Sequence, residues 1–118
     1  MEFTMPLLKI QTNVSVPDGR RDALLKKISQ TIAQQLGKPE QYMMVSVEAD
    51  RPMVFAGKNE AAAFMDLRAI GLPEGKTGQL AASLCELAKA ELGVPMDRVY
   101  INFTDVPANL WGWNGETF

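Results

Sequence analysis

The chain reads Leu36-Gly37-Lys38-Pro39 and, 56 residues later, Leu92-Gly93-Val94-Pro95. In each copy a glycine follows the last residue of a helix-like apolar pattern, and a proline stands two residues further on. This order is typical of a helix C-terminus. Repetition at a fixed distance indicates that one structural unit occurs twice. The two stretches therefore divide the chain into similar halves, each with a helix that ends at its glycine.

Apolar residues precede both glycines at a spacing of three to four. They are Leu25, Ile28, Ile32 and Leu36 in the first half, and Leu80, Leu84, Leu87, Ala88 and Leu92 in the second. This spacing places them on one face of a helix. It predicts helices over residues 19–36 and 77–92.

Strand-like segments flank each predicted helix. Residues 43–48 and 99–104 are rich in β-branched and aromatic side chains and read as strands, and residues 7–13 and 62–70 also read as strands. Each half therefore reads as strand, helix, strand, a unit in which the two strands run parallel.

The two units predict an α+β fold, in which one four-stranded mixed sheet carries both helices on one face. The opposite face is then bare, and we expect Leu, Val, Ile and Phe side chains on it. Assembly of subunits with their sheets turned inward would cover such a face. Near the end of the chain, Asn114-Gly115 stands between aromatic residues and predicts a hairpin. We expect this hairpin to reach a neighbouring subunit.

Composition agrees with one compact domain of 118 residues, of which 47% are hydrophobic, with a net charge of −2. Nucleic-acid binding is not indicated, because the longest basic clusters are the pairs Arg20-Arg21 and Lys26-Lys27. No membrane association is expected, since no stretch approaches the ~18 to 20 apolar residues that span a bilayer. The N-terminus lacks the pattern of a secretion signal. We expect a cytoplasmic protein. Export by a route that needs no signal peptide stays an open alternative.

The absence of histidine and the presence of one cysteine, Cys85, exclude several chemistries. The chain has no internal disulfide, no Cys-His or Ser-His-Asp nucleophile and no histidine-ligated zinc. Cys85 lies at helical spacing within residues 80–92, where we expect a buried or half-buried thiol.

A second group stands near the N-terminus, where Met5 is followed by Pro6. We interpret Met1 to Thr4 as a vector-derived extension and Met5 as the initiator, which leaves residues 6–118 as the single domain. Removal of residues 1–5 would make Pro6 a free secondary amine. An α-amine titrates at about 7.7 to 8.0 in a peptide, and burial or a nearby cation lowers its pKa, so a terminal proline can act as a base near neutral pH.

Several motifs occur together along residues 5–118. They are Met5-Pro6, Val16-Pro17-Asp18-Gly19, Gly37-Lys38-Pro39 with Tyr42, Ala69-Ile70-Gly71, residues 97–103 (Asp-Arg-Val-Tyr-Ile-Asn-Phe) and Gly112-Trp113-Asn114-Gly115 with Thr117 and Phe118. In this set and order the chain resembles the macrophage migration inhibitory factor family of the tautomerase superfamily. The resemblance implies a homotrimer. It also implies a keto–enol tautomerase, an isomerase that needs no cofactor or metal and acts on small aromatic keto acids such as phenylpyruvate and on dopachrome-like acids.

The resemblance also assigns roles to residues. Pro6 is the general base, Lys38 and the backbone N–H of Ile70 bind the substrate carboxylate, Tyr100 and Asn102 come from the neighbouring subunit, and Trp113 and Phe118 are apolar pocket walls. Structural roles remain open for most of them. A lysine after a helix is favoured by the helix dipole, Tyr100 and Asn102 could satisfy each other, and the two aromatic residues could simply pack in an interface.

The chain also departs from the family pattern. Ala62 and Met65 stand where vertebrate members carry Cys-x-x-Cys, so we expect no thiol–protein oxidoreductase activity. Ala69 replaces a serine and Trp111 a small aliphatic residue, and both could alter the pocket. Two functional classes remain: an enzyme that uses Pro6 as base, or a cytokine-like or host-interaction protein with a vestigial pocket that binds a protein receptor.

Overall fold

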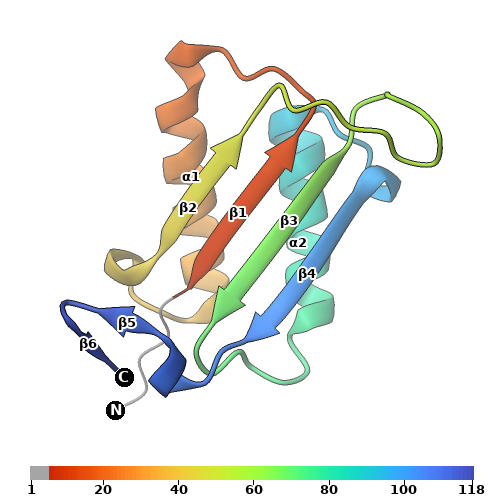
Figure 1. The fold of residues 1–118 in the computed structure, drawn as a ribbon. Coiled ribbons are helices and arrows are strands. Elements are labelled where there is room, and N and C mark those ends of the chain that lie inside the picture. Colours follow the sequence, from red (N-terminus) through yellow and green to blue (C-terminus); the bar gives the residue numbers. More distant parts are fainter. Residues whose placement is uncertain (1–5) are drawn as a thin grey trace.

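A computed structural model describes residues 6–118 of the chain (Figure 1). The sheet strands are β1 (Leu7–Thr12), β2 (Met44–Glu48), β3 (Ala63–Ala69) and β4 (Val99–Asp105); the helices are α1 (Asp18–Leu36) and α2 (Thr77–Leu87); and a hairpin is formed by β5 (Gly112–Trp113) and β6 (Glu116–Thr117). The interpretation of residues 1–5 as an extension lies outside the described residues. Among residues 6–118 no helix is both long and apolar enough to cross a bilayer.

The four long strands form one mixed sheet in the order β2-β1-β3-β4. β1 and β2 are parallel and connected through α1, β3 and β4 are parallel and connected through α2, and the two units meet where β1 and β3 run antiparallel. Both helices cover the same face of the sheet (Figure 1). The α+β fold predicted from the repeat is therefore confirmed.

The two repeated glycines end the helices as predicted. Gly37 and Gly93 adopt left-handed backbone angles, with φ of 66° and 69°, which only glycine takes without a steric penalty. The predicted second helix differs in one respect, because α2 ends at Leu87 and residues 88–92 continue as a wider π-helical turn. The sequence pattern does not distinguish the two, since the apolar positions at the end of the segment are buried in either geometry.

The hydrophobic core lies between the sheet and the helices. Along β1 and β3 every second side chain points toward α1 and α2, as the two-residue period of a strand requires. The fully buried members include Leu8, Ile10, Met65 and Leu67 from the strands and Ile28, Ile32, Leu80 and Leu84 from the helices.

The sheet face that carries no helices, the bare face, is less apolar than expected. The prediction of Leu, Val, Ile and Phe side chains on it was wrong in part. Val45, Val47 and Ile101 pack against the helix-side core instead. The bare face carries Met44, Phe64 and Tyr100, which are 65%, 39% and 67% exposed. The same face also carries polar side chains, which include Lys9, Gln11, Ser46, Asp66, Arg68 and Asn102. Strand alternation is the reason: in these strands the valines and isoleucines occupy positions that face the helices, so the bare face is amphipathic.

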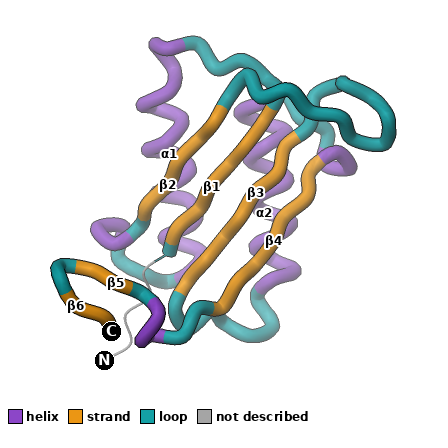
Figure 2. Tube along the Cα trace, in the orientation of Figure 1, coloured by secondary structure: helices purple, strands orange, loops and turns teal. Residues whose placement is uncertain are grey.

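The predicted hairpin forms at Asn114-Gly115, where both residues have positive φ angles of 53° and 81°. Figure 2 shows β5 and β6 beyond the end of the sheet at which β1 begins. The ring of Trp113 contacts Tyr42 of the same chain. The tail thus has a contact within its own chain, and its expected contact with a neighbouring subunit stays a prediction.

Candidate functional site

Pro6 stands directly before β1 and is fully buried. It continues the alternation that buries Leu8 and Ile10 on the helix side of the strand. Its carbonyl accepts a hydrogen bond of 3.0 Å from the backbone N–H of Met44, the first residue of β2. The next residue, Leu7, pairs with β2 on one side and with Arg68 of β3 on the other. Pro6 therefore lies where three strand ends meet.

Lys38 belongs to the connection from α1 to β2, which runs along the same end of the sheet (Figure 1). Its backbone N–H donates to the carbonyl of Ala33 at 3.0 Å and closes the end of the helix. Its half-exposed side chain takes part in none of the ion pairs found among residues 6–118. The backbone of Lys38 thus has a structural role, while its ammonium is available to an anion.

Ile70 follows the last residue of β3, at the strand end that lies beside the start of β1. It is half-buried, and the chain turns away at Gly71, whose φ is 66°. The neighbouring carbonyl, that of Ala69, accepts from the N–H of Val106 at 2.8 Å and ties this turn to the end of β4.

Trp113 and Phe118 lie at this end as well. Their rings are stacked, with centroids 6.1 Å apart and planes inclined by 14°. The N–H of Phe118 is shared between the carbonyls of Ala108 and Trp111, at 3.2 and 3.3 Å. The edge contact of Trp113 with Tyr42 attaches the pair to the segment that carries Lys38. Five of the seven predicted site residues therefore belong to segments that converge at one end of the sheet.

Tyr100 and Asn102 are not part of this group. Both lie on β4, the edge strand, and their side chains are exposed on the bare face. The register pairs Tyr100 with Phe64, and Phe64 with Gln11 of β1. Gln11 is five residues along β1 from Pro6, so Tyr100 is displaced from Pro6 by about 16 Å along the strands and about 10 Å across them. Within one chain these two residues cannot share a small substrate with Pro6.

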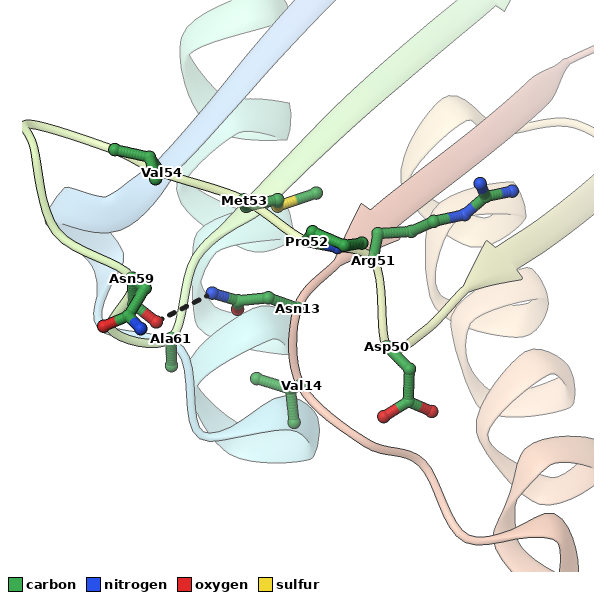
Figure 3. A pocket seen from close by; sticks show the side chains of 9 residues that line it. All are labelled: Asn13, Val14, Asp50, Arg51, Pro52, Met53, Val54, Asn59 and Ala61. Carbon is green, nitrogen blue, oxygen red and sulfur yellow. Dashed lines mark hydrogen bonds between the residues drawn. The ribbon is translucent and has the colours of Figure 1, made fainter.

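A hollow of about 660 Å³ lies at the other end of the sheet (Figure 3). Asn13 and Val14 line it from the end of β1, and Asp50 to Val54, Asn59 and Ala61 line it from the loop between β2 and β3. The amide of Asn13 donates to the carbonyls of Asn59 and Glu60, so its polar group supports the loop. This hollow contains none of the predicted site residues.

Two residues near Tyr100 were given no role on the basis of the sequence. These residues are Phe55 and Arg98. The ring of Phe55 contacts that of Tyr100, with centroids 4.7 Å apart. Arg98 lies over the Phe55 ring, with its guanidinium carbon 5.2 Å from the ring centroid. Arg98 belongs to one of the family motifs, but the spacing of residues along a chain does not predict its contacts with a loop 37 to 43 positions earlier.

The departures from the family pattern can now be placed. Ala62 and Met65 are 2% and 1% exposed and belong to the core. Ala69 is fully buried on the helix side of β3, so it does not line the bare face. Trp111 is half-buried, and its backbone holds Phe118. Cys85 is half-buried as expected, and desolvation, with a further contribution from Glu86, raises the pKa of its thiol above 9.0.

Known proteins resemble this chain in both sequence and fold. The family model of macrophage migration inhibitory factor matches residues 5–118. The macrophage migration inhibitory factor of Mus musculus is 41% identical over 118 residues, covering 97% of this chain and 99% of that protein. A homolog from Brugia malayi is 37% identical over 115 residues, with the same coverage.

Solved structures agree with this. The crystal structure of a macrophage migration inhibitory factor homologue from Prochlorococcus marinus superposes with a TM-score of 0.90 at 41% identity, covering 95% of this chain and 98% of that one. The Trichinella spiralis protein gives a TM-score of 0.84 at 30% identity, covering 95% and 99%. With a family model that matches nearly the whole sequence and a shared βαβ-repeat fold, the chain belongs to the macrophage migration inhibitory factor family of the tautomerase superfamily.

Proposed function

We propose that this protein, when its chain begins at Pro6, is a keto–enol tautomerase that acts on small aromatic keto acids such as phenylpyruvate and needs no cofactor. Membership of the tautomerase superfamily supports an isomerase in general. The substrate, the base and the binding residues are our proposal.

One observation carries the proposal: Pro6 is fully buried at the sheet end where the segments bearing Lys38, Ile70, Trp113 and Phe118 converge. A buried secondary amine loses solvation of its charged form, which lowers its pKa and favours the neutral base at pH 7. An unpaired ammonium on an adjacent segment adds to this effect and supplies a cation for a carboxylate.

The proposed reaction moves one proton. The neutral Pro6 nitrogen removes it from the carbon next to the keto group; the electron pair of that C–H bond forms a C=C bond to the keto carbon, and the π pair of the C=O bond moves onto the oxygen. The protonated amine then delivers the proton to this oxygen, which yields the enol and restores the base. Lys38 and the Ile70 N–H hold the carboxylate throughout, while Trp113 and Phe118 contact the aromatic ring and exclude water.

The proposed enzyme is a homotrimer. Tyr100 lies about 16 Å and Asn102 about 10 Å along the strands from Pro6 in one chain, and both stand two strands away, so they can complete its site only from a second copy. Both side chains are exposed on the amphipathic face, which also presents Met44 and Phe64 to solvent in a single chain. Burial of this face between copies would bring the donors of one chain to the base of the next.

The test compares two preparations, one that begins at Pro6 and one that retains Met1 to Met5. In the longer chain the Pro6 nitrogen is an amide and has no basicity. We expect phenylpyruvate tautomerisation, followed by ultraviolet absorbance, only in the shorter chain, and we expect sedimentation of both as trimers. Equal activity in the two preparations would exclude Pro6 as the base. Folded trimers with no activity in either preparation would exclude this substrate or this base.

A second candidate is a cytokine-like or host-interaction protein that binds a receptor. The observation that favours it is the 41% identity to a mouse protein named for inhibition of macrophage migration. Lys38 distinguishes the candidates, because a receptor surface does not require a lysine, without an ion pair among residues 6–118, at the sheet end where Pro6 is buried. A migration assay with macrophages, run with the active chain and its Pro6→Gly variant, separates receptor binding from catalysis.

A further inference from the structure

Arg98 is a buried cation without a carboxylate. It lies just before β4, its residue is 9% exposed, and it forms no ion pair with any of residues 6–118. A buried charge is tolerated only where hydrogen bonds replace its lost water. The side chain of Arg98 therefore has a specific structural task.

That task is to bind the loop between β2 and β3. The guanidinium donates four hydrogen bonds, all to backbone carbonyls of this loop. Its Nε donates to Ala61 at 2.8 Å, one terminal nitrogen donates to Phe55 at 3.1 Å, and the other donates to Lys58 at 3.2 Å and Glu60 at 3.1 Å. One planar side chain thus fixes four points along seven residues of loop.

The amide of Asn13 supports this loop at Asn59 and Glu60, and the turn before these residues needs further support. Ala56 and Gly57 have positive φ angles of 55° and 74°, and Phe55 and Lys58 form an isolated bridge. A positive φ is unfavourable for an alanine, so the turn relies on contacts outside itself. Arg98 supplies four of them.

The residue positioned most directly is Phe55. Its carbonyl accepts from Arg98, and the guanidinium also lies over its ring, 5.2 Å from the centroid. The same ring also contacts the ring of Tyr100, with centroids 4.7 Å apart and planes inclined by 49°. Arg98, Phe55 and Tyr100 therefore form a row of contacts, in which Phe55 connects the buried Arg98 to the exposed Tyr100.

Tyr100 depends on this row. β4 is an edge strand, so a strand neighbour, Phe64, stands on one side of Tyr100 only. The tyrosine is 67% exposed, and an exposed side chain is free to change rotamer unless a neighbour restrains it. Phe55, Phe64 and Tyr100 share the wall of a hollow of about 450 Å³, which leaves room for the phenol to move.

We propose that Arg98 is a positioning residue which, by binding the carbonyls of the 55–61 loop, sets the Phe55 ring and through it the direction of the Tyr100 phenol toward the substrate of an adjacent subunit. This inference rests on the proposed function, in which Tyr100 binds substrate. It makes the β2–β3 loop part of the site, although the loop contributes no group that touches substrate.

The conservative variant for the test is Arg98→Lys. It keeps the charge, but one ammonium cannot reach carbonyls spread from Phe55 to Ala61 in the way that a planar fork does. Phe55→Leu removes the ring contact and leaves Arg98 in place. Arg20→Lys is the matched control, because Arg20 is exposed on α1 and far along the chain from the loop.

Kinetics on phenylpyruvate give the first readout. We expect KM to rise about three- to tenfold in Arg98→Lys and in Phe55→Leu, the size of a lost aromatic contact, with kcat within about twofold because Pro6 is untouched. In a Tyr100→Phe background, which lacks the phenol hydroxyl, both effects should shrink, since the two changes act through one group.

Fluorine NMR gives a readout that needs no activity. The chain contains two tyrosines, Tyr42 and Tyr100, so protein labelled with fluorotyrosine gives two signals, and Tyr100→Phe assigns them. We expect the Tyr100 signal to move toward its unfolded position in Arg98→Lys and Phe55→Leu, and to stay in place in Arg20→Lys.

The outcomes separate the two proposals. An active wild type whose KM and Tyr100 signal are unchanged in both variants overturns the positioning role and leaves the proposed function standing. An inactive wild type refutes the proposed function, and the fluorine signal then decides the positioning role alone. If Arg98→Lys does not fold, Phe55→Leu decides: a fixed Tyr100 signal in that variant contradicts the inference.

Discussion

The indole of Trp113 meets the phenol ring of Tyr42 edge to face, with centroids 6.0 Å apart and planes at 89°. This contact joins the C-terminal hairpin to the short 3₁₀ helix Glu40–Tyr42, which directly follows Lys38 and Pro39. Edge-to-face geometry is the favoured arrangement of two aromatic rings. The tail is therefore held over the end of the sheet where Pro6 is buried.

Replacement of Trp113 by leucine should weaken the site without unfolding the chain. The indole is 52% exposed, so its loss costs little core burial, while the stacking on Phe118 and the contact with Tyr42 both disappear. We expect a KM for phenylpyruvate about three- to tenfold higher, with a melting temperature within a few degrees of the wild type. Leu110→Ala is the control, since Leu110 is 71% exposed and should change neither value.

Replacement of Lys38 by alanine should reduce substrate binding and spare stability. Its N–H, which closes α1 on Ala33, is retained in any residue, and its side chain forms no ion pair within residues 6–118. Loss of a charged hydrogen bond to a carboxylate predicts a KM about ten- to hundredfold higher. The free energy of unfolding should stay within about 0.5 kcal/mol. Lys89→Ala is the matched exposed lysine; a similar KM change there would attribute the effect to net charge.

The repeated glycines should be costly to replace. Gly37→Ala and Gly93→Ala each place a Cβ at a left-handed position, so each should lower the free energy of unfolding by about 1–2 kcal/mol. Gly19 provides the contrast, because it lies inside α1 at a helical position with open space around it. Gly19→Ala should be neutral or stabilising by up to about 1 kcal/mol. Denaturant unfolding measures all three, and equal effects would refute the assignment of the two caps.

The thiol of Cys85 should react slowly with alkylating reagents at neutral pH. Burial first, and the carboxylate of Glu86 second, raise its pKa above 9.0, so less thiolate is present at neutral pH than in an unfolded chain. The rate of alkylation by iodoacetamide should therefore rise with pH, with a midpoint at higher pH in the native protein than in denaturant. Glu86→Gln should move the native midpoint down by only part of this difference. Fast alkylation at pH 7 would show that the thiol is more accessible than its place on α2 suggests.

Local patterns in the sequence predicted most of the fold. The glycine at each helix end, the helical spacing of Ile28 and Ile32, and the Asn-Gly turn depend on neighbours within a few residues, so their physics can be read along the chain. The character of the bare face was predicted less well. The parity of each strand decides which side chains face outward, and a shift of one residue reverses it.

The candidate site divides in the same way. Its residues were predicted from the resemblance to a family, and the distance between Pro6 and Tyr100 could not be predicted from the sequence. Strand order and register supply that distance, about 16 Å along the strands, and with it the requirement for a second chain.

The sequence by itself determined two βαβ units, their helix ends and the types of group available for chemistry, because these follow from periodicity, turn residues and composition. Only the tertiary structure decided that Pro6 is buried where three strands meet, that Tyr100 stands on the edge strand β4, two strands from β1, and that Arg98 binds a loop some 40 residues earlier in the chain. Those relationships join segments far apart in sequence, and they depend on strand register and on hydrogen bonds of a buried charge, which no local pattern encodes.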